Sequence, residues 1–168
     1  MTVSASSLIV DGTDESFRDL VGGLILFAAQ IQNVRQVLSN ELGVTQPQYN
    51  ILMILAHQKA KQSLSVKRLA ERMNVTPSFI VVETNKLLAR GLLNKQTSTA
   101  DRRRINLQLT ETAIETIAKL GPLQRHVNDM LFGELTKADF KSLTQIMKKL
   151  IARYEPTLIE VEKYQSRK

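Results

Sequence analysis

The fold is decided by residues 76–91, which read TPSFIVVETNKLLARG. Thr76 is a favoured N-cap residue, and Pro77 follows it at the first helical position, where a missing N–H group costs nothing. Gly91 is suited to the left-handed conformation that ends many helices. The segment therefore predicts a helix that runs to Arg90 and stops at Gly91.

A shorter helix and a hairpin flank this segment. Ser65 can cap a helix that ends before a turn at Asn74 and Val75. Residues 92–96 and the alternating apolar and polar residues 105–109 read as two strands, joined by a polar tip with three consecutive arginines. This order of elements, a helix-turn-helix and then a basic hairpin, predicts a winged helix-turn-helix.

A long helix and a buried helix are predicted before this module. Apolar residues recur every three or four positions from Asp14 to near Gly43, which predicts one long amphipathic helix. Thr45 and Gln48 match a capping box at the start of an almost wholly apolar helix.

Two more helices are predicted after the hairpin, with Thr110 and Thr136 as their caps. Gly121-Pro122 should kink or interrupt the first of them. The predicted fold class is mainly α, and it divides as follows: a disordered N-terminus over residues 1–13, a winged helix-turn-helix domain over residues 45–110, and a helical dimerisation region over residues 14–43 and 111–168.

The net charge of +7 comes from 23 basic and 16 acidic residues, and its location is more informative than its size. The window from Lys61 to Arg104 holds ten basic and three acidic residues, so it carries the whole excess, and the rest of the chain nets zero. A basic module on a neutral body is the electrostatic footprint expected for a polyanion such as double-stranded DNA.

Several classes of function are disfavoured by composition. The absence of cysteine excludes disulfides, iron–sulfur clusters and thiol redox chemistry. His57 and His126 show no metal-ligand or triad spacing, and there is no glycine-rich phosphate loop, so we expect neither an enzyme nor a bound cofactor or metal. No signal peptide is visible, and the longest apolar run, Leu20 to Ala29, is too short for a bilayer, so we expect a cytoplasmic protein without membrane contact.

Three motifs resemble the MarR family of bacterial regulators. They are Thr76-Pro77-Ser78 at the start of the central helix, its end at residues 87–92, and the hairpin sequence DRRRINLQLT at residues 101–110. The resemblance covers roughly residues 17 to 155. It implies a transcriptional regulator, by default a repressor, that binds palindromic duplex DNA as a homodimer with interlocking terminal helices.

The apolar stripes of the terminal helices favour a dimer independently, because such helices need a partner surface. The alternative is that these stripes cover the core of their own domain.

The central helix, which we call the recognition helix, has two predicted faces. At 100° per residue, one face should pack on the domain core and contains Ile80, Thr84, Leu87 and Leu88. The opposite face should enter the major groove. We call it the outer face, and it contains Ser78, Phe79, Val82, Asn85 and Lys86, with Val81 at its edge.

Polar groups on the outer face have separate predicted roles. Ser78 and Asn85 can hydrogen-bond base edges or phosphates, and Lys86 is a candidate phosphate contact. Further phosphate contacts are expected from the preceding helix, where the candidates are Lys67, Arg68 and Arg72, with ordinary solvated charges as the alternative.

The recognition helix departs from the family in its middle. Val81 and Val82 stand where relatives commonly carry Thr-Arg, and Glu83 stands where an apolar residue is usual. Exposed valines, with Phe79, can contact thymine methyl groups, which predicts readout weighted toward A·T pairs and toward the wing. Two alternatives stay open: the valines are partly buried, or the chain is a winged-helix protein-interaction module without specific DNA binding.

The hairpin tip is the predicted wing. The resemblance implies that Asp101 pairs with Arg103 and holds the loop. Arg102 is the candidate for insertion into the minor groove, whose negative potential attracts arginine, and Arg104 is the candidate for the DNA backbone.

The resemblance also implies a small aromatic or lipophilic acid as effector, bound where the dimerisation helices meet the winged domain. Arg35 is the candidate for holding its carboxylate. Each lining residue can also be plain core, and the predicted lining is Leu24, Phe27, Ile31, Arg35, Tyr49, Met53 and His57.

Overall fold

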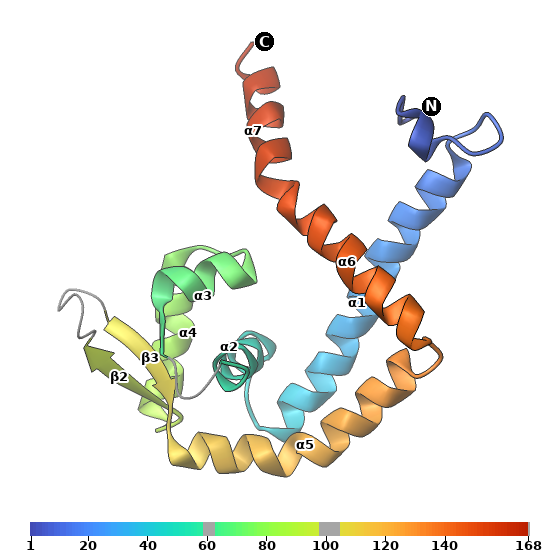
Figure 1. The fold of residues 1–168 in the computed structure, drawn as a ribbon. Coiled ribbons are helices and arrows are strands. Elements are labelled where there is room, and N and C mark those ends of the chain that lie inside the picture. The colour runs from blue at the N-terminus through green and yellow to red at the C-terminus, as the bar shows by residue number, and fades with distance from the viewer. Residues whose placement is uncertain (59–62, 98–104, 168) are drawn as a thin grey trace. The chain divides into compact units, whose positions relative to one another are not determined.

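A computed structural model of the chain describes residues 1–58, 63–97 and 105–167 (Figure 1). The chain divides into two compact units, Met1–Gln124 and the residues from Arg125 onward. The described helices and strands are α1 Glu15–Glu41, α2 Gln46–Ala56, β1 Leu64–Ser65, α3 Val66–Met73, α4 Pro77–Ala89, β2 Leu93–Thr97, β3 Ile105–Leu109, α5 Glu111–Phe132, α6 Lys137–Ala152 and α7 Tyr154–Gln165.

A winged helix-turn-helix forms the centre of the first unit, as predicted. Helices α3 and α4 are joined by a short turn, and β2 and β3 pair antiparallel as the predicted hairpin. The sheet has the order β1-β3-β2, so the central strand is β3. Strand β1 was not predicted, because two residues are too few to show the alternation of a strand.

Side-chain caps start the helices where the sequence places them. Ser65 Oγ accepts the backbone N–H of Arg68 at 3.3 Å, and Thr76 Oγ1 accepts that of Phe79 at 3.3 Å. The predicted capping box at the start of α2 is present, and Thr110 and Thr136 cap α5 and α6. These caps satisfy amide groups that the first turn of a helix leaves without partners, and so they fix each starting point.

Each of the two helices of the helix-turn-helix ends at or next to a residue with positive φ. Asn74 ends α3 with φ 53, a left-handed conformation that asparagine adopts more readily than most residues. Gly91 follows α4 with φ 66, where glycine pays no Cβ penalty. The chain therefore turns sharply before α4 and leaves it directly into the hairpin.

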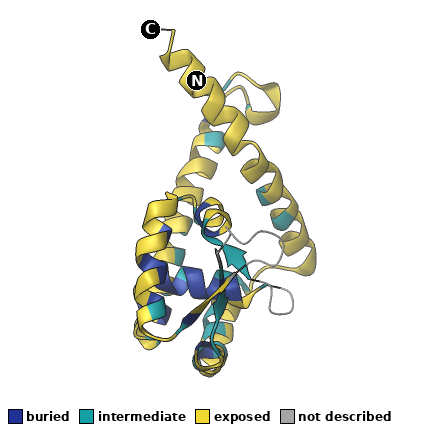
Figure 2. Cartoon of the chain, turned by 90° about the vertical axis from the view of Figure 1, so that its left-hand side faces the viewer, coloured by how far each residue is buried: buried dark blue, intermediate teal, exposed yellow. Residues whose placement is uncertain are grey.

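The core of the first unit lies between α2, the inner faces of α3 and α4, the sheet, and the adjoining parts of α1 and α5 (Figure 2). Its fully buried side chains come from all of these layers, with Ser39 from α1 and Ala113 from α5. They include Ile51, Leu52, Leu69, Ile80, Leu87, Leu93 and Leu107. This core holds the module rigid, so the exposed side of α4 has a defined surface.

Helix α5 continues through Gly121-Pro122, so the predicted interruption is wrong. Proline removes one backbone hydrogen bond to the carbonyl of residue 118. Ala118 is exposed, so water can satisfy that carbonyl group. Residues 1–13, for which we predicted a disordered terminus, include a 3-10 turn at Ser6–Leu8 and an isolated bridge between Val10 and Thr13.

The second unit consists of the end of α5 with α6 and α7. The sequence predicts a last helix near residues 137–154, which is α6, but does not predict α7 beyond it. Within the described residues, neither α6 nor α7 has a buried side chain. Their exposed apolar residues include Phe140, Leu143, Ile146, Leu150, Tyr154 and Leu158.

Candidate DNA interface

The two faces of the recognition helix α4 are as predicted. Ile80 and Leu87 are fully buried, Thr84 is buried, and Leu88 is half-buried. All five residues of the outer face are exposed. The Thr84 hydroxyl donates to the Ile80 carbonyl oxygen at 2.7 Å, so this buried polar group is satisfied inside the helix.

The apolar residues of the outer face are exposed to solvent. The exposed fractions are 38% for Phe79, 43% for Val81 and 52% for Val82. The alternative in which the valines are partly buried therefore does not hold for this chain. The exposed part of these valine side chains gains no burial energy in the folded chain, so it is available for contact with another molecule.

Glu83 is buried on the inner side of α4, with 7% of its surface exposed. Glu83 therefore does not lie on the outer face. A carboxylate exposed on that face would have supported the alternative of a protein-interaction module. Its Oε2 accepts a hydrogen bond from Gln48 Nε2 of α2 at 2.9 Å, and its Oε1 accepts one from Lys86 Nζ at 2.7 Å. The pKa of Glu83 is lowered below its usual value, mainly by the hydrogen bond from Lys86. Burial acts in the opposite direction, and the hydrogen bonds from Gln48 and Thr45 and the charge of Lys86 lower the pKa further.

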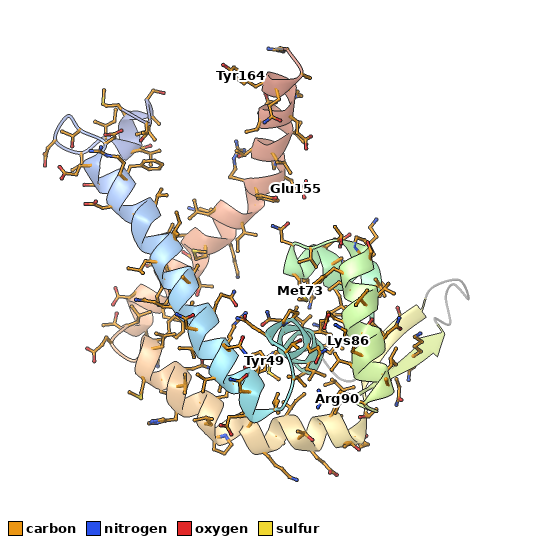
Figure 3. All side chains as sticks on the ribbon, turned by 180° about the vertical axis from the view of Figure 1, so that it is seen from behind. Tyr49, Met73, Lys86, Arg90, Glu155 and Tyr164 are labelled. Carbon is orange, nitrogen blue, oxygen red and sulfur yellow. The ribbon has the colours of Figure 1, made fainter. Side chains whose placement is uncertain are left out.

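Lys86 pairs with Glu83 and also faces solvent. Its side chain is 56% exposed, although its ammonium group lies 2.7 Å from the carboxylate. Figure 3 shows Lys86 along α4, with Arg90 nearer the end of that helix. A lysine held this way has its charge partly balanced within the chain, while its remaining N–H groups can still donate to a phosphate.

The basic residues of α3 are also exposed. Lys67, Arg68 and Arg72 all face solvent. Arg72 lies in the last turn of α3, where the negative end of the helix dipole stabilises a cation. Lys95 is exposed on β2. The candidate wing residues Asp101, Arg102, Arg103 and Arg104 lie outside the described residues, so their roles stay predictions.

The predicted effector residues lie along α1 and α2, and they differ in exposure. Tyr49 and Met53 are buried, Phe27 and Ile31 are half-buried, and the exposed ones are Leu24, Arg35 and His57. Arg35 Nη1 donates to Asn50 Oδ1 at 3.3 Å. Burial raises the pKa of the Tyr49 hydroxyl, and the charge of Arg35 opposes this rise. The Arg35 guanidinium therefore lies near enough to Tyr49 to interact with it electrostatically.

Two cavities bordered by described residues of the first unit lie elsewhere. One of about 380 Å³ is bordered by the end of α2, the end of β3 and the start of α5, and its lining includes Leu55, Gln58, Leu109, Ile114 and Ile117. A smaller one of about 160 Å³ is bordered by Leu42, Leu52, Arg90 and Ala113, among others. Neither is lined by the residues predicted for the effector.

Two residues that bond the recognition helix to the rest of the first unit were missed in the sequence. Gln48 was read only as the third residue of a capping box, but its amide also reaches Glu83. Arg90 was read only as the end of the helix, but its Nη1 donates to the Gly43 carbonyl oxygen at 2.9 Å. The unusual carboxylate at position 83 was the available signal, because a charge at a position one turn from Ile80 needs a partner.

Two further features are absent from the described part of the chain. No group of three or more histidine, aspartate or glutamate side chains there is placed to hold a metal ion. No helix there is long and apolar enough to cross a membrane.

The helix-turn-helix, the hairpin and the solvent-facing side of α4 define a winged helix-turn-helix protein. A sequence profile of the MarR family matches residues 42–104. The chain is 31% identical over 123 residues to a Thauera aromatica protein whose name assigns it to transcriptional regulation of the hcr operon; the match covers 73% of this chain and 72% of that one. The chain belongs to the MarR family of transcriptional regulators.

Two further similarities agree with this assignment. The "HTH-type transcriptional repressor MdtR" of Bacillus subtilis strain 168 is 34% identical over 98 residues, which are 58% of this chain and 61% of that protein. The crystal structure of a MarR/EmrR family transcriptional regulator from Acinetobacter sp. ADP1 has the same fold, with a TM-score of 0.71, 16% identity, and coverage of 83% of this chain and 96% of that one.

Proposed function

We propose that this regulator binds palindromic duplex DNA as a homodimer and represses transcription. The observation that carries the proposal is the exposed outer face of α4, which stands on a fully packed core. The window from Lys61 to Arg104 that contains this helix also holds the whole net positive charge of the chain. An α-helix fits the major groove, and basic residues around it supply the salt-dependent part of the affinity for DNA.

The outer face supports a readout weighted toward A·T pairs. Phe79, Val81 and Val82 present methyl groups and a ring to solvent, and apolar contact of this kind favours the thymine methyl group. No arginine lies on the outer face, so the bidentate contact that most often reads guanine is missing from it. Asn85 and Ser78 are the polar groups available to base edges.

The apolar surface of α6 and α7 supports the dimer. Side chains spaced three and four residues apart on α6, from Phe140 to Leu150, are exposed in the single chain. The first half of α1 adds a second exposed apolar surface, with Ile25 exposed to 68% and Leu26 to 60%. A second copy of this chain that covers these surfaces would bring two recognition helices to the two halves of a palindrome.

A small aromatic or lipophilic acid completes the proposal as the effector that releases DNA. Its support is the cation Arg35 beside Tyr49 on the α1–α2 side of the first unit. Salicylate and benzoate should raise the melting temperature of the protein, because a ligand that binds only the folded state stabilises it. Arg35→Ala should abolish this rise. Absence of any rise with the unaltered protein would remove the effector from the proposal.

Repression is supported by the function that the name of the Bacillus subtilis relative states. A gel shift at physiological salt with the DNA upstream of the protein's own gene tests the DNA-binding part. We expect a discrete complex that survives an excess of unrelated duplex. Binding that the unrelated duplex removes completely would refute the proposal and favour a protein-interaction module.

A further inference from the structure

The α1–α2 junction, which we define as residues 42–48 and which includes the first turn of α2, touches the recognition helix through polar contacts at two places. The first joins α4 to the start of α2: Gln48 Nε2 donates to Glu83 Oε2 at 2.9 Å, and both residues are buried. The second joins the end of α4 to the junction itself: Arg90 Nη1 donates to the Gly43 carbonyl oxygen at 2.9 Å. Both contacts reach the same short segment of chain.

Two attachments fix more than one does. Glu83 and Arg90 are seven residues apart, which is about 10 Å along an α-helix. The hydrophobic contacts of Ile80 and Leu87 hold α4 against the core, but apolar contacts tolerate small slides because they have no direction. Hydrogen bonds at two points along the axis restrict the tilt and the slide of the helix.

The junction is in turn attached to α1. Gln46 Nε2 donates to the Gln32 carbonyl oxygen of α1 at 2.9 Å, and the Val44 amide donates to the Ser39 carbonyl oxygen at 3.0 Å. Gly43 has φ +61, a left-handed conformation that makes the turn between α1 and α2 possible. Hydrogen bonds thus attach the junction to α1 on one side and to α4 on the other, and the backbone of residues 43–48 connects the two sets.

The burial of Glu83 needs an explanation of its own. A buried carboxylate is costly unless it is fully hydrogen-bonded, and an apolar side chain would fill the same place without that cost. Glu83 has partners on both oxygens, Gln48 on one and Lys86 on the other. Unlike an apolar side chain, the carboxylate makes a directional hydrogen bond, which joins the recognition helix to Gln48 of α2.

We propose that Glu83 is a positioning residue, which sets the pose of the recognition helix for DNA by bonding it to Gln48 at the α1–α2 junction. The inference rests on the proposed DNA-binding function. It assigns to Glu83 an effect on the discrimination of DNA sequences, although the side chain does not face the groove. It also makes the α1–α2 junction the segment through which a shift of α1 would reach α4.

The test compares Glu83→Ala with Glu71→Ala, which removes a carboxylate from the exposed surface of the neighbouring helix α3. Each substitution deletes one negative charge, and by charge alone each should tighten binding to DNA. We expect Glu83→Ala instead to lower the ratio of specific to non-specific affinity about tenfold, because it leaves Gln48 without its partner. Glu71→Ala should leave that ratio unchanged.

Two further variants separate positioning from loss of folding. Glu83→Gln keeps an acceptor for Gln48, so it should restore most of the ratio. The double variant Gln48→Ala with Glu83→Ala should lower the ratio no further than Glu83→Ala alone, because both substitutions remove the same bond to α4. Its loss of the α2 capping box lowers the folded fraction, which does not change the ratio. A smaller folded fraction would lower specific and non-specific binding by the same factor and leave the ratio unmoved. An unchanged ratio in Glu83→Ala would overturn the inference.

Hydrogen exchange decides the inference without DNA. In Glu83→Ala, we expect faster exchange of amides in α4 and in residues 42–48, with α3 and α5 unaffected. A uniform increase over the first unit would mean that Glu83 contributes only to global stability, and would refute the positioning role. If the unaltered protein does not discriminate between DNA sequences, the proposed function fails, while the exchange pattern still answers whether Glu83 holds α4 in place.

Discussion

At position 83 the recognition helix carries a carboxylate on its inner side, next to the buried Ile80, Thr84 and Leu87. The periodicity that assigns these three residues to the core face also places residue 83 near it, one turn after Ile80. From the sequence we could say only that Glu83 stands where an apolar residue is usual, and charged residues are seldom buried without partners. Its partner Gln48 is 35 residues away in the sequence, and a pattern within one helix contains no information about that distance.

The ionised form of Glu83 should make stability depend on pH. Its pKa is lowered from the usual 4.5, so the folded chain binds this proton less readily than the unfolded chain does. Its contribution is therefore present above pH 4.5 and is lost as the pH falls through the lowered pKa. Glu83→Gln lacks this contribution.

Urea unfolding followed by circular dichroism at fixed protein concentration measures the effect. We expect the unaltered protein to be more stable than Glu83→Gln at pH 7, and the difference in unfolding free energy to shrink below pH 4.5. A difference that stays constant down to pH 3 would contradict the assignment of an ionised, hydrogen-bonded Glu83.

At the scale of elements, local signals predicted most of the fold. Thr76, Pro77 and Gly91 act within one or two turns of the helix that they delimit, so one segment of sequence contains the whole cause. The two-residue strand β1 was missed because it exists only through pairing with Leu107 and Asn106 of β3. The sequence left open whether Pro122 kinks or interrupts its helix, because solvation of a freed carbonyl is a property of the surface, and α5 is not interrupted.

The cap of the recognition helix should contribute measurably to stability. Thr76→Ala removes the acceptor for the Phe79 amide and should lower the free energy of unfolding by about 1 kcal/mol. Thr76→Ser keeps a hydroxyl at the same place and serves as the control, with little change expected. Chemical denaturation of the three proteins measures these differences. Equal stability of the alanine and serine variants would show that the cap contributes nothing.

The wing should contribute a charge-dependent part of DNA binding. Arg102→Ala should weaken binding and reduce the slope of log affinity against log salt concentration by about one unit, because it removes one positive charge from the minor groove, where the phosphate charges concentrate negative potential. Lys163→Ala on α7 removes the same charge far along the chain from the helix-turn-helix and should leave the slope unchanged. Fluorescence anisotropy at several salt concentrations measures both. Identical slopes for Arg102→Ala and the unaltered protein would remove Arg102 from the interface.

At the scale of the whole molecule, charge and apolar surface are separated along the chain. The net positive charge lies between residues 61 and 104, and the exposed apolar residues of α1, α6 and α7 lie outside that window. The predicted division into a DNA-binding module and dimerisation helices is consistent with this separation. The proposed dimer cannot be derived from one chain, because the single chain shows only which surfaces are left uncovered.

The apolar surface of α6 should be needed for the dimer. Leu150→Asp places a charge on this surface and should convert the protein from dimer to monomer in sedimentation velocity, because an unpaired charge is costly to bury in an interface. Lys148→Asp changes a neighbouring exposed residue outside the apolar stripe and should leave the dimer intact. A Leu150→Asp protein that sediments as a dimer would place the interface elsewhere.

Selection of binding sites from random duplex DNA, with the full chain at physiological salt, tests the central claim most directly. We predict enrichment of a palindrome whose half-sites are about one helical turn, roughly 10 base pairs, apart, with A·T pairs opposite Val81 and Val82. A pool that shows no enriched sequence would contradict the account of this chain as a specific DNA-binding regulator. Enrichment of half-sites rich in G·C pairs would retain the regulator but refute the readout by the exposed valines.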